Sequence, residues 1–170
     1  MFGDVSMIRS AAKNPATSPE LTDTLKQSVS TKRAQVLSIL KEAASKFPAI
    51  TFANSFGAED MVLTDIIMRE KLAIEIFSLD TGRLPAETYT LMSEVESTYQ
   101  TKLKIYFPQH KTVEEYVQKN GINAFYESID MRKACCHMRK VEPLQRALKG
   151  KQAWITGMRA EQATTRANLP

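Results

Sequence analysis

Cysteine is scarce in this sequence: its 170 residues include two, the neighbours Cys135 and Cys136. Neighbouring cysteines rarely bond each other, because the small ring that such a bond closes distorts the peptide between them. The scarcity of cysteine favours a reducing compartment. In such a compartment, paired cysteines more often bind a metal or carry out redox chemistry than stabilise a fold.

Long apolar runs are also absent. No stretch of the sequence approaches the roughly 20 apolar residues that span a membrane. The N-terminal stretch "MFGDVSMIRSAAKNP" lacks the continuous apolar core of a secretion signal. We therefore expect a cytoplasmic protein without a membrane partner.

Neither sign of charge dominates strongly. Hydrophobic residues make up 43% and charged residues 25% of the chain, so we expect one globular domain with a real core. The net charge is only +4, but residues 131–170 hold nine Lys or Arg against two Glu. This basic C-terminal quarter suggests an anionic ligand, although a nucleic-acid surface would give the same count.

The order of apolar and polar segments indicates an α/β fold. Residues 1–17 are predicted to form a loose tail, and Ser18–Leu21 is typical of a helix start. Four apolar strands alternate with helical stretches of 10–20 residues, which predicts an open, mostly parallel sheet with helices on both faces. The predicted strands are 49–55, 72–80, 102–107 and 152–157; the predicted helices are 31–46, 60–69, 86–99, one that starts at a Thr112 cap, and 131–148.

Polar segments follow three of these strands, at the edge of a parallel sheet where ligands bind. After the first strand, Ser55 and Gly57 precede a helix, whose free N–H groups favour an anion. Glu59 and Asp60 oppose this interpretation unless they bond the loop itself. The segment matches neither the Walker A pattern nor G-x-G-x-x-G, and alone it is equally typical of an ordinary turn.

The segments after the second and fourth strands also allow both a binding site and an ordinary surface turn. The stretch "LDTGRLP" places Asp80, Thr81 and Gly82 between a strand and a helix, either as a capped turn or as a second part of a nucleotide site. After the fourth strand, Arg159 and Arg166 could hold a phosphate or sulfate through paired N–H groups. Solvated surface arginines would explain them nearly as well.

The cysteine pair is the most specific signal. On a helix, the two side chains would point about 100° apart, so they would not easily share one metal ion. An iron–sulfur cluster offers separate iron corners, usually held by four thiolates. Two buried free cysteines are the alternative, and His137 is more typical of a surface or capping group than of a ligand.

In order and spacing, these segments resemble the assimilatory adenylyl-sulfate/3′-phosphoadenylyl-sulfate reductases. The resemblance covers about Ala49 to Pro170 and rests on "SFGAEDMVL", "LDTGRLPAETY", "KACCHMRKVEPLQRAL" and "ITGMRAEQATTRANLP". It implies an adenine nucleotide alpha-hydrolase-like fold, similar to the N-type ATP pyrophosphatases. It also implies reduction of adenylyl sulfate, or its 3′-phosphorylated form, to sulfite and AMP with thioredoxin, for cysteine biosynthesis.

The resemblance assigns roles to individual residues. Ser55 and Gly57 would face the nucleotide, Leu79, Asp80, Thr81 and Gly82 would line the adenosine pocket, and Lys140, Arg159 and Arg166 would contact the substrate. Cys135 and Cys136 would be two of the four ligands of a 4Fe–4S cluster. Family members without a cluster lack this pair and generally use the 3′-phosphorylated substrate, so the pair favours adenylyl sulfate.

Family members also carry a C-x-x-C pair and a nucleophilic cysteine near the C-terminus, and this sequence has neither. We therefore expect both beyond Pro170, no catalytic residue within the chain, and no turnover by the chain alone. The alternatives are a nucleotide-binding module without redox turnover and an ATP-using adenylating enzyme. We expect no nucleic-acid partner, and the oligomeric state, a homo-oligomer included, stays open.

Overall fold

The computed structural model of this chain describes residues 22–158. The chain divides into two units, Met1–Gln35 and Val36–Pro170, and the sheet belongs to the second unit. The predicted tail at 1–17 and the predicted helix start at Ser18–Leu21 lie outside the described residues, as do Arg159 and Arg166.

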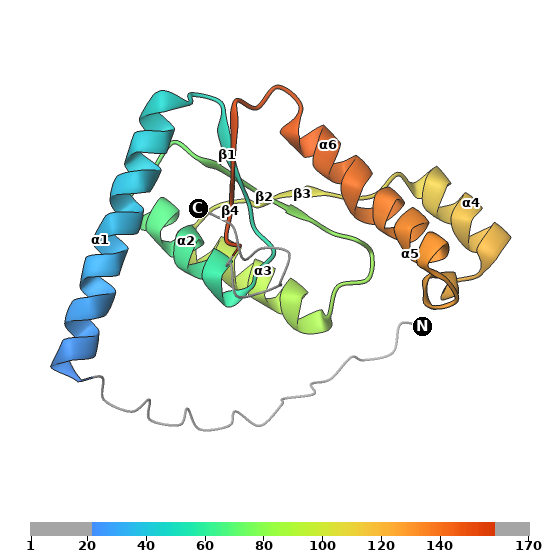
Figure 1. The fold of residues 1–170 in the computed structure, drawn as a ribbon, viewed down its shortest axis with the longest axis horizontal. Helices are drawn as coiled ribbons and strands as arrows, with labels where there is room; N and C mark the ends of the chain where they lie inside the picture. Colours follow the sequence, from blue (N-terminus) through green and yellow to red (C-terminus); the bar gives the residue numbers. More distant parts are fainter. Residues whose placement is uncertain (1–21, 159–170) are drawn as a thin grey trace, which may run out of the picture. The chain divides into compact units, whose positions relative to one another are not determined.

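The sheet has four parallel strands in the order β3-β2-β1-β4 (Figure 1). The strands are β1 (Ile50–Ala53), β2 (Glu75–Leu79), β3 (Lys104–Tyr106) and β4 (Ala153–Thr156). Each strand is shorter than its predicted segment. The parallel pairing confirms the predicted α/β class.

The helical segments connect these strands, and one of them carries the cysteine pair. They are α1 (Asp23–Lys46), α2 (Ala58–Arg69), α3 (Ala86–Tyr99), α4 (His110–Asn120), the 3₁₀ turn η1 (Ala124–Tyr126), α5 (Ile129–Cys136), the π-helical segment η2 (His137–Val141) and α6 (Glu142–Leu148). No helix within residues 22–158 is long and apolar enough to cross a membrane.

Three helix predictions were wrong in detail. The first helix begins at Asp23 instead of residue 31, because Thr22 accepts a bond from the Leu25 N–H at 3.3 Å and starts it earlier. Thr112 is not a cap but lies inside α4, whose N-cap is Gln109. The single helix predicted for 131–148 begins at Ile129 and is interrupted by η2.

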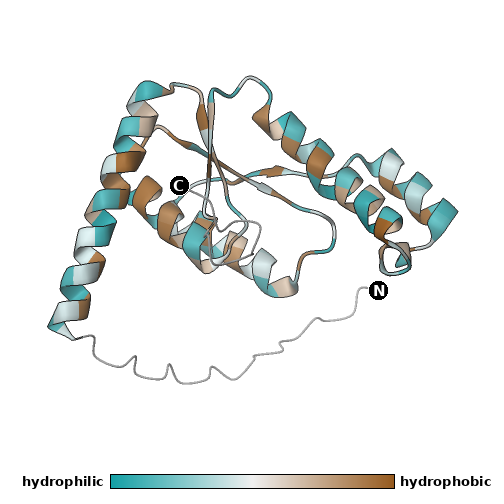
Figure 2. Ribbon diagram, viewed as in Figure 1, coloured by the Kyte–Doolittle hydropathy of each residue, from teal (hydrophilic) through white to brown (hydrophobic). Residues whose placement is uncertain are grey.

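The core lies on both faces of the central strand β1. Phe52 and Thr51 point to opposite faces and are both fully buried, so the sheet is covered on each side. Going from β1 to β2 to β3 moves one way across the sheet, and β4 returns to the far side of β1. Because such crossovers are right-handed, α2 and α3 cover one face and α6 the other. Figure 2 shows the hydrophobic residues gathered on the strands and on α2.

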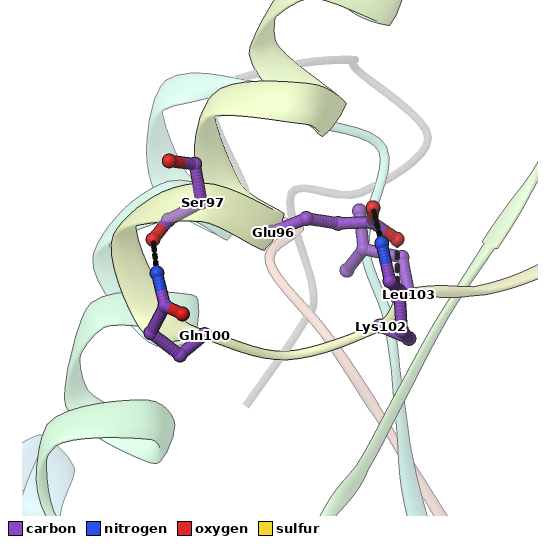
Figure 3. Close-up of polar contacts among 5 residues, drawn as sticks. All are labelled: Glu96, Ser97, Gln100, Lys102 and Leu103. Atoms are coloured by element: carbon purple, nitrogen blue, oxygen red, sulfur yellow. Dashed lines mark hydrogen bonds and ion pairs between the residues drawn. The ribbon is translucent and has the colours of Figure 1, made fainter.

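The end of α3 is fixed by side chains that bond the following turn. The Glu96 carboxylate accepts the Leu103 N–H and the Lys102 ammonium, both at 2.9 Å, and Gln100 bonds the Ser97 carbonyl (Figure 3). The Leu103 N–H, followed by Lys102, lowers the pKa of Glu96. This turn sets the direction in which the chain enters β3.

Candidate functional site

The loop between β1 and α2 is stabilised by hydrogen bonds to a buried carboxylate. Asp60, in the first turn of α2, accepts both the backbone N–H and the hydroxyl of Ser55, each at 2.6 Å. Asn54 accepts the Phe56 N–H at 2.6 Å, which stabilises Phe56 in the left-handed region with φ of 63°. Asp60 therefore bonds the loop itself. Two hydrogen-bond donors of Ser55 face its negative charge, which reduces the repulsion of an anion bound at the loop.

The end of β4 packs directly against this carboxylate. A Cβ atom on Gly157 would lie 2.1 Å from Asp60 Oδ1 and 3.3 Å from the Asp60 backbone nitrogen. Only glycine fits there without a shift. The ends of the first and fourth strands thus meet as predicted, and Gly157 is two positions before Arg159.

The turn after β2, residues 80–83, is built in a similar way. Asp80 is buried, and its Oδ1 accepts the Gly82 N–H at 2.7 Å and the Tyr89 hydroxyl at 3.0 Å. Burial, and then the hydrogen bond to Asp80, raise the pKa of Tyr89. Gly82 has φ of 69°, a conformation that other residues rarely adopt. Buried Asp80 therefore stabilises the 80–83 turn as Asp60 stabilises the loop after β1.

A pocket of about 230 Å³ opens between these two loops, and we call it the strand-end pocket. Its wall includes Ser55, Phe56, Leu79, Thr81, Leu84 and Lys140. Four residues expected to contact the nucleotide therefore line the same pocket: Ser55, Leu79, Thr81 and Lys140. Gly57, Asp80 and Gly82 belong to the same loops and shape them, Gly57 as the residue before α2.

The wall is mostly apolar, with polar groups at one side. The apolar part of the wall consists of Phe56, Leu79 and Leu84. The polar part consists of Ser55 and Thr81, which can form hydrogen bonds, and Lys140, which adds one positive charge. This combination suits a planar ring that carries an anionic group. Lys140 reaches the wall from η2, 61 residues after Leu79 in the sequence.

The cysteine pair lines a second pocket of about 260 Å³, which we call the cysteine pocket. Cys135 is half-buried and Cys136 exposed. Four cationic side chains share this pocket with them: Arg83, Arg132, Arg139 and Lys140. Thr81 and Lys140 line both pockets, so the two pockets are neighbours.

Two of these cations, Arg139 and Lys140, come from the π-helical segment η2 that directly follows α5. They follow the cysteine pair by three to five positions, and residues three and four positions apart lie on the same side of a helix. This spacing places both cations beside the cysteines. The interruption was not predicted, because nothing in the local apolar spacing distinguishes it from an α-helix.

Two arginines join the 80–83 turn to the helical segments. Arg139 Nη1 donates to the Thr81 carbonyl at 2.6 Å. In the opposite direction, Arg83 donates to the Ile122 carbonyl at 2.7 Å and lies 4.7 Å above the Phe125 ring. Neither contact could be predicted from the sequence, because the two partners of each lie 39 or 58 positions apart.

The resemblance implies a 4Fe–4S cluster, for which these residues supply part of a ligand set. Cys135 and Cys136 line one pocket with cations around them, and cationic groups offset the charge of thiolates. A cluster usually needs four thiolates, and the part of the chain that the structure describes has no group of three or more His, Cys, Asp or Glu placed to hold a metal. The pair therefore fits half of the ligand set.

Comparison with known proteins gives consistent matches. The family model for the phosphoadenosine phosphosulfate reductase domain matches residues 49–170. An adenosine 5′-phosphosulfate reductase of Allochromatium vinosum is 50% identical over 149 residues, which cover 88% of this chain and 57% of that protein. The enzyme of the same name from Burkholderia cepacia is 47% identical over 131 residues, 77% of this chain and 52% of that protein.

A solved structure is also similar. The phosphoadenylyl-sulfate reductase of Candida auris, determined as a phosphate complex, aligns with a TM-score of 0.63 at 28% identity. The alignment covers 83% of this chain and 70% of that one. The chain spans about half the length of the curated relatives it matches.

Proposed function

This chain belongs to the phosphoadenosine phosphosulfate reductase domain family, and we propose that it binds adenylyl sulfate in a reductase that forms sulfite and AMP for sulfate assimilation. One observation carries the proposal: the strand-end pocket and the cysteine pocket share Thr81 and Lys140. A ligand in the first pocket would therefore have one end beside the cysteine pair. The proposed compartment is the cytosol, where thioredoxin would be the reductant.

We place the adenine ring against Phe56, Leu79 and Leu84, the apolar part of the wall. The phosphosulfate would then extend toward Lys140, where the pockets meet. Its negative charge must be offset before a thiolate can approach it, and fixed cations do this well in a site shielded from water. Arg159 and Arg166, which follow β4 in the sequence, are proposed as further contacts to the phosphosulfate.

The proposed reaction has two steps. A cysteine thiolate attacks the sulfate sulfur, the bond from that sulfur to the bridging oxygen breaks, and AMP leaves with the electron pair. The sulfo group then stays on the cysteine sulfur. The dithiol of thioredoxin releases sulfite, returns the cysteine to its thiol form and becomes a disulfide.

Neither Cys135 nor Cys136 is proposed as that nucleophile. Both end helix α5 and continue into η2, so they lack the mobility needed to move between substrate and thioredoxin. We propose instead that they bind an iron–sulfur cluster together with two further thiolates. When bound, the cluster would supply a charged metal centre next to the cations of the cysteine pocket.

Binding is tested by titration calorimetry of the 170-residue chain with adenylyl sulfate, AMP and ATP. Adenylyl sulfate should bind most tightly, and Arg159→Ala and Arg166→Ala should each weaken it by about 1.5–3 kcal/mol, the contribution of a hydrogen bond to a charged group. Lys119→Ala, on the exposed surface of α4, is the matched control. Tighter binding of ATP would favour the adenylating alternative.

Turnover is tested separately with labelled adenylyl sulfate and reduced thioredoxin. We expect binding by the 170-residue chain without sulfite release, because its two thiols are assigned to the cluster. Mass spectrometry should find no S-sulfonated cysteine. Sulfonation of Cys135 or Cys136 followed by sulfite release would show that the ligand assignment is wrong.

A further inference from the structure

We propose that Arg139 is a positioning residue that sets the affinity for the nucleotide by fixing the 80–83 turn. It would act from the segment that follows the cysteine pair, without touching the nucleotide itself. The inference rests on the proposed function for its ligand, but the contact that carries it is present without one.

The contact is close and specific. Arg139 Nη1 donates to the Thr81 carbonyl at 2.6 Å, across 58 positions of sequence. A Cβ atom on Gly82 would lie 3.2 Å from the same nitrogen, so the guanidinium also fills the space above that glycine. The guanidinium therefore holds the turn both by a hydrogen bond and by contact.

The bonds within the turn leave its position open. Asp80 to the Gly82 N–H and Thr81 to the Arg83 N–H fix how the chain curls. These hydrogen bonds do not fix the position of the turn relative to η2. Gly82 has the largest conformational freedom of any residue type, so a turn built on it gains most from an outside contact. Arg83, through Ile122, and Asp80, through Tyr89, attach the turn to other segments, and Arg139 supplies the contact to η2.

Thr81 links this contact to the ligand. It lines the strand-end pocket on one side and the cysteine pocket on the other. If the turn is already ordered before the ligand arrives, binding does not have to order it, and the affinity is higher. Loss of the Arg139 contact should therefore weaken binding of AMP as well as adenylyl sulfate, because both carry the adenosine proposed to occupy the strand-end pocket.

The chain offers matched variants for the test. Arg139→Met removes the charge and the bond, and Arg139→Lys keeps the charge on a side chain that ends one bond short of Nη1. Arg139 Nε is buried without a hydrogen-bond partner among residues 22–158, and lysine lacks that group, so Arg139→Lys should fold well. Arg132→Met removes one charge from the same pocket without touching the turn.

The first measurement needs no nucleotide: hydrogen exchange of the amides of residues 80–83. Exchange should speed up in Arg139→Met, return part of the way in Arg139→Lys and stay unchanged in Arg132→Met. Unchanged exchange in Arg139→Met would overturn the inference even if the chain binds adenylyl sulfate as proposed.

The second measurement is calorimetry with AMP and with adenylyl sulfate. Arg139→Met should bind both nucleotides at least about 10-fold more weakly, because the loss of one hydrogen bond from a charged group lowers affinity by about that factor or more. Its melting temperature should stay close to that of the parent chain. Arg139→Lys should recover part of the loss, and Lys119→Ala, on the exposed surface of α4, should stay within about twofold. Affinity within twofold for Arg139→Met, or no recovery with lysine, would refute the positioning role. A parent chain that binds neither nucleotide would refute the proposed function, and with it the effect on affinity.

Discussion

Replacing Gly157 by alanine should disturb the loop that carries Ser55, although the two residues are far apart in sequence. The added Cβ would lie 2.1 Å from Asp60 Oδ1, much closer than atoms in van der Waals contact. It would also lie 3.3 Å from the Asp60 backbone nitrogen, so rotation of the carboxylate alone does not make room. Either β4 shifts or Asp60 moves away from Ser55.

The size of the effect follows from these two options. Inserting a methyl group into a packed site typically costs about 1–3 kcal/mol. If Asp60 moves, the two 2.6 Å bonds to Ser55 lengthen as well. Each bond to a charged group contributes about 1.5–3 kcal/mol, of which part is kept through water. We therefore expect a loss of about 2–4 kcal/mol in the free energy of unfolding, a large share of the about 5–15 kcal/mol of a typical domain.

Urea unfolding of Gly157→Ala, with Gly57→Ala as control, measures this loss. A Cβ on Gly57 would meet its nearest atoms, in Glu59 and Ser55, at 3.5 and 3.6 Å, which is ordinary contact, so the control should stay close to the parent. Combining Gly157→Ala with Asp60→Ser should cost less than the sum of the single changes, because the smaller side chain relieves the clash. Strictly additive changes, or a loss below about 0.5 kcal/mol in Gly157→Ala, would refute the described contact between β4 and α2.

Three further predictions address charge, acidity and the cysteines. Lys140→Met should weaken adenylyl sulfate about 10-fold in calorimetry but AMP much less, because Lys140 is proposed to face the sulfate; equal losses for both would contradict that placement. Because the pKa of Glu96 is lowered by the Leu103 N–H and by Lys102, its stabilisation is present above the ordinary carboxyl pKa of 4.5 and is lost as the pH falls through the lower folded value. Glu96→Gln should therefore flatten the acid limb of urea midpoints measured below about pH 5, and an unchanged limb would rule this out. Anaerobic reconstitution of the 170-residue chain should give no stable four-iron cluster by iron and sulfide analysis, because Cys135 and Cys136 fill half the usual ligand set; a full cluster on the monomer would show that the ligands are misassigned.

The fold could be predicted largely from local pattern. Apolar strands that alternate with helical segments gave the parallel sheet, and α3 was predicted with the bounds observed, Ala86–Tyr99. Because ligands bind beyond the carboxyl ends of parallel strands, the sequence pointed to the loops that carry Ser55 and Thr81, and both residues line the strand-end pocket. These successes share a cause, because each depends on residues within one or two neighbouring elements.

What could not be predicted depends on distant partners. The Gly157–Asp60 contact and the Arg139–Thr81 bond join residues that local periodicity treats as unrelated. The η2 segment keeps the apolar spacing of a helix, so its wider turn has no signature in the sequence. Thr112 has the side chain of a good cap, but the chain had already entered α4 at His110.

The carboxylate of Asp60, one of the two acids that opposed an anion site, bonds the loop itself. Asp60 and Asp80 lie under the two strand-end loops and accept hydrogen bonds from residues of those loops, Ser55 and Gly82. Their charges are thereby matched to backbone and hydroxyl donors inside the protein. The positive charge of the site comes from a different element, since Lys140 belongs to η2. An anion would thus meet loops made rigid by buried acids and a cation carried by the cysteine segment. Both parts are needed, and for this reason we expect substitutions in η2 to change ligand affinity as strongly as substitutions in the loops.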